Sequence, residues 1–125
     1  IMSKRKKIAK IYDKELSKIN TLNLPGYGKR DQSANHLYVL NVDFKKIGIN
    51  RTKFCKLMLK NNIGTQLHYI PIPLHNSYKK LNYNLKSLPN TKKYYNSGIS
   101  IPIYANLKLS EQKKIISVIK SICIK

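Results

Sequence analysis

Acidic residues are scarce in this chain of 125 residues. Five aspartates and glutamates stand against 25 lysines and arginines, which gives a formal net charge of +20. The five acids are spread over the whole chain, so no pair of carboxylates is placed for general acid and base catalysis. Chemistry that rests on two neighbouring carboxylates is therefore not expected.

Cysteine is almost absent too. Cys55 and Cys123 lie far apart, each in an apolar stretch with helical spacing, and there is no C-x-x-C or zinc-ligand spacing. A metal site is therefore not expected. The two thiols are typical of small core residues in a reducing compartment, which predicts a cytoplasmic protein.

Long apolar runs and the usual catalytic motifs are also missing. No run of about 18 apolar residues exists, so no membrane span is expected. The lysine-rich start has no apolar core behind it, which excludes a secretory signal. The chain has no glycine-rich phosphate loop, no G-x-S-x-G and no Cys/His nucleophile pattern. The aromatic residues form no base-stacking platform.

The excess of basic residues has two interpretations. Lysine (22), isoleucine (17) and asparagine (13) make up 52 of the 125 residues, and all three have A/T-rich codons. The basic residues are scattered from Lys4 to Lys125, with one run at residues 4–7. We favour compositional bias; a surface selected to bind polyanions remains the alternative.

The first helix is expected over residues 2–19. Apolar residues at Ile8, Ile11, Tyr12, Leu16 and Ile19 follow helical spacing. Four cations would occupy the first turn, where the helix dipole favours anions. We therefore expect the helix to begin upstream of Ile1 and the chain to be a piece of a longer protein.

The remaining pattern alternates short strands and helices, which predicts a small α/β layer with few strands. We expect extended stretches at 22–24, 36–44, 63–70 and 99–104, with a turn at Gly64. Helices are expected at 51–62 with Asn50 as N-cap, at 74–81, at 88–97 between Pro89 and Gly98, and at 111–122 with Ser110 as N-cap.

The stretch GTQLHYIPIPLH, Gly64–His75, is the densest in polar and aromatic side chains. If it is extended, Gln66 and His68 share one face and Tyr69 takes the other, packed inside, unless Tyr69 and His68 exchange roles. Pro71 and Pro73 would stiffen the return and bring His75 to the same mouth. Alternatively, His68 fills a gap in the core and the segment only connects. His36 is interpreted as a structural histidine.

An ordered set of motifs resembles the C-terminal part of the DegT/DnrJ/StrS-type sugar aminotransferases. KRKKIAKIYDKELSKI is similar to the helix that leads into their small domain, and NIGTQLHYIP is similar to G-I-x-T-x-x-H-Y-x-P. LPNTKKYY, SIPIY and LSEQ follow in family order. Within the family, the resemblance is strongest to the pseudaminic-acid branch. Two departures are Pro73, where a histidine is common, and L-P-N-T-K in place of L-P-x-A-E.

The resemblance implies the small C-terminal α/β domain of a fold-type-I aminotransferase. Residues 1–20 would be the helix from a large domain, and residues 21–125 the small domain. The family binds pyridoxal phosphate (PLP) through a lysine in an S-F-H-x-x-K context, which neither DFKK nor KFCK matches. The 125 residues alone are therefore expected to bind no PLP covalently and to have no transaminase activity.

The resemblance also implies substrates and partners. The intact enzyme would transfer an amino group from glutamate to C4 of a UDP-linked 4-keto-6-deoxy sugar, as a homodimer. The substrate-binding residues would be Gln66, His68, Tyr69 and His75, with His68 donating to a sugar or phosphate oxygen. Two alternatives stay open: a small basic module that binds RNA or DNA, and an inactive paralogue that only dimerises with a complete enzyme. Under the aminotransferase interpretation, no sequence-specific binding of nucleic acid is expected.

Overall fold

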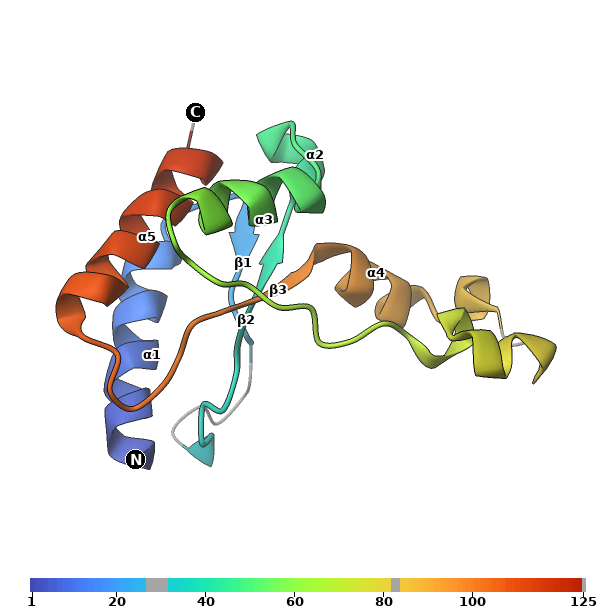
Figure 1. Cartoon of the computed structure of the whole chain (residues 1–125), viewed down its shortest axis with the longest axis horizontal. Coiled ribbons are helices and arrows are strands. Elements are labelled where there is room, and N and C mark those ends of the chain that lie inside the picture. Colours follow the sequence, from blue (N-terminus) through green and yellow to red (C-terminus); the bar gives the residue numbers. More distant parts are fainter. Residues whose placement is uncertain (27–31, 82–83, 125) are drawn as a thin grey trace.

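A three-stranded antiparallel sheet lies at the centre of the chain, with helices packed around it (Figure 1). The computed structural model describes residues 1–26, 32–81 and 84–124. The α/β architecture predicted from the sequence is confirmed. The main elements are α1 (Met2–Leu16), β1 (Leu22–Asn23), β2 (Tyr38–Val42), α2 (Phe44–Ile47), α3 (Arg51–Lys60), α4 (Pro89–Ser97), β3 (Gly98–Ile101) and α5 (Leu109–Cys123), with 3-10 turns η2 (Ile72–Leu74), η3 (Asn76–Leu81) and η4 (Leu85–Ser87).

Strand β2 is the middle strand of the sheet. It pairs with β1 through Leu22 and Val42, and with β3 through Tyr38 and Ile101. Directly paired residues of antiparallel strands share a face. One face therefore carries apolar side chains into the core, and the other carries Val39 and Ser100. The core-facing strand residues are Leu22, Tyr38, Leu40, Val42, Ile99 and Ile101.

Helices α1 and α5 lie side by side and contribute to the same apolar core (Figure 1). The predicted stripe of α1 is confirmed, since Ile8, Tyr12 and Leu16 are buried. The buried amide of Gln112 in α5 donates to the Ile8 carbonyl at 2.8 Å. The Lys120 ammonium meets the Glu15 carboxylate at 2.6 Å and lowers the pKa of that carboxyl.

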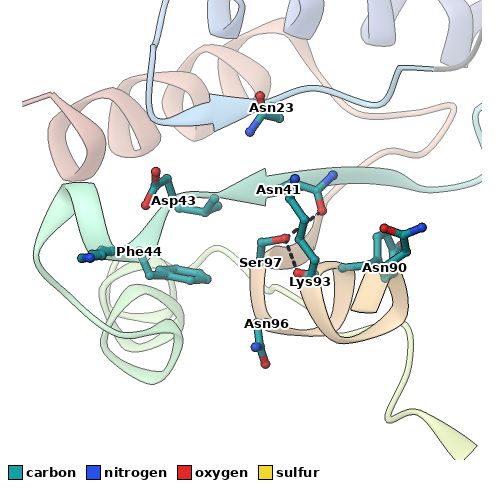
Figure 2. A pocket seen from close by; sticks show the side chains of 11 residues that line it. Asn23, Asn41, Asp43, Phe44, Asn90, Lys93, Asn96 and Ser97 are labelled. Carbon is teal, nitrogen blue, oxygen red and sulfur yellow. Dashed lines mark hydrogen bonds between the residues drawn. The ribbon is translucent and has the colours of Figure 1, made fainter. Parts of the chain in front are cut away.

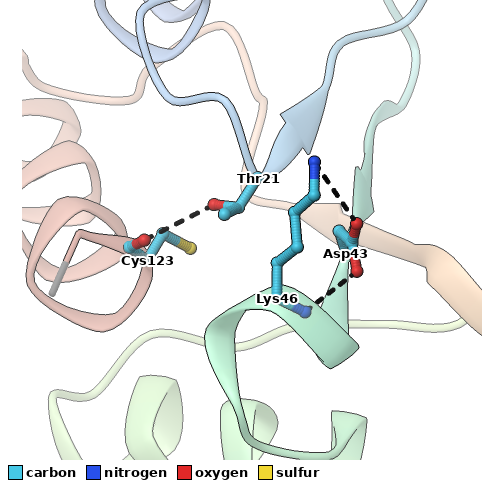
Figure 3. Close-up of polar contacts among 4 residues, drawn as sticks. All are labelled: Thr21, Asp43, Lys46 and Cys123. Carbon is cyan, nitrogen blue, oxygen red and sulfur yellow. Dashed lines mark hydrogen bonds and ion pairs between the residues drawn. The ribbon is translucent and has the colours of Figure 1, made fainter.

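Polar contacts tie three segments together where β1 begins, β2 ends and α5 ends (Figure 3). The Thr21 hydroxyl donates to the Cys123 carbonyl at 3.4 Å, and the Asp43 N–H donates to the Thr21 carbonyl at 2.8 Å. The Asp43 carboxylate accepts the Lys46 N–H at 3.0 Å and caps α2. The strand expected over 36–44 is therefore shorter, because the capping of α2 ends β2 at Val42.

The helix ends confirm one predicted cap and correct two other details. Asn50 accepts the Lys53 N–H at 2.8 Å, as predicted. Ser110 is not the N-cap of α5, which begins at Leu109, because the Glu111 carboxylate takes the N–H of Lys108 at 2.8 Å. The turn after α3 is not made at Gly64. Asn62 makes it with a φ of 59°, and asparagine tolerates that conformation well.

An arm that contains η2 and α4 extends away from the sheet (Figure 1). Neither of these two elements has a buried residue. Pro89 opens α4 and Gly98 follows its end, as predicted. A Cβ on Gly98 would lie 2.9 Å from the Tyr94 carbonyl oxygen, so the arm needs glycine where it rejoins the sheet. Apolar side chains stay exposed on the arm, among them Ile72, Leu74, Tyr78 and Leu81.

Candidate functional site

The predicted site segment is attached to the free edge of β3. Gln66 and Ser100 exchange two backbone hydrogen bonds: the Gln66 N–H donates at 3.1 Å and the Ser100 N–H donates at 2.8 Å. This is an isolated bridge, not a fourth strand. It holds the segment beside the sheet at one point and leaves the residues after it unpaired with β3.

A hollow of about 350 Å³ lies beside this bridge. Gln66 and His68 both line it, so the structure brings together the two residues that the sequence placed on one face. Both ring nitrogens of His68 are buried and have no hydrogen-bond partner among the described residues. The lining residues are His36, Leu37, Gly64, Thr65, Gln66, His68, Ser100, Ile101, Pro102 and Ile103.

Tyr69 and His75 do not line this hollow. Tyr69 is 74% exposed, so the expectation that it packs inside is wrong for this chain. Its ring contacts the His68 ring edge to face, with centroids 4.8 Å apart. Strand alternation does not hold there, because pairing with β3 stops at Gln66. His75 is exposed, and its Nε2 lies 3.0 Å from the Ile70 carbonyl oxygen.

The sequence interpretation did not include Ser100 and took His36 as a structural histidine. Ser100 is only 7% exposed, and its hydroxyl has no partner among the described residues. A serine between Ile99 and Ile101 in an apolar strand was the available signal. His36 lines the same hollow, and its Nδ1 is 3.4 Å from an Arg5 guanidinium nitrogen. The separation of 31 positions in the sequence hid that contact.

A second, larger hollow of about 660 Å³ lies between the sheet and α4 (Figure 2). Asn23 and Asn41 come from the strands, and Asn90 and Asn96 come from α4. The Ser97 hydroxyl bridges the two walls: it is 3.1 Å from Asn41 Oδ1 and 2.9 Å from the Lys93 carbonyl. This hollow is rich in amides, but none of the residues predicted for the site line it.

Comparison with known proteins decides the family. A family model described as "DegT/DnrJ/EryC1/StrS aminotransferase family" matches residues 1–120. The chain belongs to this family. The resemblance read from the motifs is thereby confirmed.

Curated relatives support the assignment. The spore coat polysaccharide biosynthesis protein SpsC of Bacillus subtilis is 32% identical over 98% of this chain and 32% of its own length. The UDP-4-amino-4,6-dideoxy-N-acetyl-beta-L-altrosamine transaminase of Campylobacter jejuni is 32% identical over 90% of this chain and 29% of its own length. The chain thus spans about a third of the length of the relatives that it matches.

Solved structures share the fold. Helicobacter pylori PseC, an aminotransferase in the biosynthesis of pseudaminic acid, matches with a TM-score of 0.83 and 28% identity. The match covers 98% of this chain and 32% of PseC. The PLP form of Streptococcus pneumoniae Spr1654, a putative sugar aminotransferase, matches with a TM-score of 0.85 at 23% identity, over 98% of this chain and 31% of its own.

The described residues do not by themselves fit PLP. A Schiff-base lysine works desolvated or beside a partner that lowers its pKa. Lys45 and Lys93 line the larger hollow, but both side chains are exposed. Asp43, the acid beside them, is occupied as the cap of α2 and as a partner of Lys46 at 3.9 Å. The residues of this chain are therefore given no catalytic role in a PLP-dependent step.

The part of the chain that the structure describes holds neither a metal-binding cluster nor a membrane-spanning helix. Within residues 1–26, 32–81 and 84–124, no three His, Cys, Asp or Glu side chains are grouped so that they could hold a metal ion. In the same part of the chain, no helix has the length and apolar character needed to cross a membrane.

Proposed function

We propose that the chain is the small-domain part of a PLP-dependent sugar-nucleotide aminotransferase. The complete enzyme would move an amino group from glutamate to C4 of a UDP-linked 4-keto-6-deoxy sugar. The observation that carries the proposal is the hollow at the edge of β3, where the family-matched segment places Gln66 beside an unpaired His68. The names of the Campylobacter and Helicobacter relatives support an amino-sugar substrate.

The role of this chain would be to bind the sugar nucleotide and to orient it. The Gln66 amide offers both a donor and an acceptor to sugar hydroxyls. His68 offers a ring N–H in a hollow whose walls include Ile101 and Ile103, where a hydrogen bond is stronger than in water. Tyr69 and His75 are proposed to reach the substrate from the rim, since both are exposed.

Cofactor and proton transfers would belong to the rest of the enzyme. PLP, when bound there, supplies the electron sink that transamination needs. We propose that residues 1–20 connect to the cofactor-binding domain and that residues 21–125 form the small domain. We also propose a cytoplasmic homodimer. The exposed apolar side chains of the arm support a contact of this arm within such an assembly.

The test is an assay of the complete enzyme that contains this chain. With PLP it should show a visible absorbance band and should aminate a UDP-4-keto-6-deoxy-N-acetylhexosamine when glutamate is supplied. The 125 residues alone should show neither the band nor turnover. A complete enzyme that binds PLP but aminates only free amino-acid or keto-acid substrates would contradict the sugar-nucleotide assignment.

A further inference from the structure

Unpaired buried polar atoms gather at one place in this fold. Among the described residues, the buried side-chain nitrogens and oxygens without a hydrogen-bond partner belong to Arg5, His68 and Ser100. His68 and Ser100 line the hollow at the edge of β3, and Arg5 contacts His36, which also lines it. A buried polar atom without a hydrogen-bond partner destabilises the fold, and folds rarely concentrate several such atoms in one place without a ligand.

Ser100 is the most buried of these three residues. Ser100 pairs with Val39 on one side and with Gln66 on the other, so these three side chains lie on one face of the sheet. That is the face opposite the apolar core. Ser100 is 7% exposed and lines the hollow, and its backbone N–H and carbonyl both form hydrogen bonds with Gln66. The hydroxyl therefore has its proton available for a bound group.

Several groups around the hollow can donate hydrogen bonds. The Arg5 guanidinium can only donate, so the His36 Nδ1 that it contacts accepts, and a neutral His36 carries its proton on Nε2. The His68 ring carries at least one N–H, and the Ser100 hydroxyl adds another donor. No carboxylate is among the residues that line the hollow. A site with donors, a cation nearby and no acid favours an anion.

We propose that the hollow formed by His36, His68 and Ser100, with Arg5 behind His36, binds a small oxyanion, a phosphate or a carboxylate. The volume of about 350 Å³ is ample for such a group. The oxyanion site is inferred from the geometry of these residues and does not depend on the proposed function. Its assignment to the diphosphate of a sugar nucleotide or to the carboxylate of the amino donor rests on the proposed function.

The experiment follows the histidine ring signals of the 125-residue chain by NMR while inorganic phosphate or glutamate is added. Chloride keeps the ionic strength constant, so that weak binding to surface lysines is screened. The rings of His68 and His36 should shift saturably. The backbone amide of Ser121 is the internal control, because Ser121 is exposed on α5 and does not line the hollow. Saturation by phosphate alone identifies the nucleotide as the source, and saturation by glutamate alone identifies the donor.

Ser100→Ala removes the hydroxyl and keeps the backbone pair with Gln66. Losing a hydrogen bond to a charged group should weaken binding about tenfold. Ser121→Ala is the matched control, since Ser121 is exposed on α5 and, among the described residues, its hydroxyl bonds to the Val118 carbonyl, so this variant should leave binding unchanged. If neither anion gives a saturable shift, or if the Ser121 amide shifts with the same saturation as the His68 and His36 rings, the oxyanion site is wrong. The proposed function would be untouched, because PLP binding and sugar amination are measured separately.

Discussion

Gln66 and Ser100 exchange both of their backbone hydrogen bonds across the edge of β3, at 3.1 and 2.8 Å. This pair holds the site segment against the sheet and satisfies the edge of β3 at the position where Ser100 faces the hollow. The position of His68 depends on it, because His68 follows Gln66 by two residues and has no hydrogen bond of its own among the described residues.

Removing one bond of this pair should loosen the segment locally. Gln66→Pro deletes the N–H that donates to the Ser100 carbonyl, whereas Gln66→Ala keeps it. A net hydrogen bond is worth about 0.5–1.5 kcal/mol, so the Ser100 amide should exchange with deuterium several-fold faster in Gln66→Pro. Hydrogen exchange by NMR checks this. Equal exchange in the proline and alanine variants would show that the pair does not hold the segment.

Substitution of glycine by alanine should destabilise the chain at Gly98 and have little effect at Gly64. Gly98→Ala puts a Cβ 2.9 Å from the Tyr94 carbonyl oxygen, a backbone atom that cannot move away freely. We expect a loss of about 1–3 kcal/mol in the free energy of unfolding. Gly64→Ala is the control, since its Cβ would meet nothing within 4 Å. Urea unfolding measures both, and a Gly64→Ala loss as large as that of Gly98→Ala would contradict the packing described.

Burial should make Cys123 unreactive in the folded chain. Burial raises the pKa of its thiol from 9.0 to about 11, although the Thr21 side chain lowers it slightly. The reactive thiolate is therefore scarce at pH 8 in the folded state and much more abundant in the unfolded state. Because the unfolded thiol loses its proton first, this group lowers stability as the pH rises from about 9 to about 11.

Labelling with iodoacetamide at pH 8, read by mass spectrometry, should modify half-buried Cys55 first. Denaturant should raise the Cys123 rate about a hundredfold, from both deprotonation and access. Rapid labelling of Cys123 without denaturant would show that the end of α5 opens in the native state.

The net charge of +20 should give only salt-sensitive contact with nucleic acid. Binding by scattered lysines releases counterions, so affinity for a DNA or RNA oligonucleotide should fall steeply with salt and vanish near 150 mM. Fluorescence anisotropy with one oligonucleotide and its scrambled sequence checks this. Nanomolar and sequence-dependent binding at that salt would favour the basic-module alternative.

The fold was predictable from the sequence where one pattern dominated. The helical stripe of Ile8, Tyr12 and Leu16 and the cap at Asn50 needed only local rules. Local rules failed at Ser110, because Glu111 capped the helix instead, and at Tyr69, because a single bridge does not impose strand alternation. Gln66 and His68 were found together from their spacing. Ser100 and Arg5 were not, because only the tertiary fold brings Ser100 to the hollow and Arg5 to His36, which lines it.

The central claim is that Gln66 and His68 bind the sugar nucleotide and do not carry the proton transfers. The most direct measurement is steady-state kinetics of the complete enzyme with His68→Ala, Gln66→Ala and the control Lys114→Ala, whose side chain is exposed on α5. The account predicts that KM for the UDP-keto-sugar rises about tenfold or more in the first two variants, with kcat changed much less, and that the control matches the wild type. An unchanged KM in both site variants would contradict the account and leave Gly64–His75 as a connector with a structural histidine.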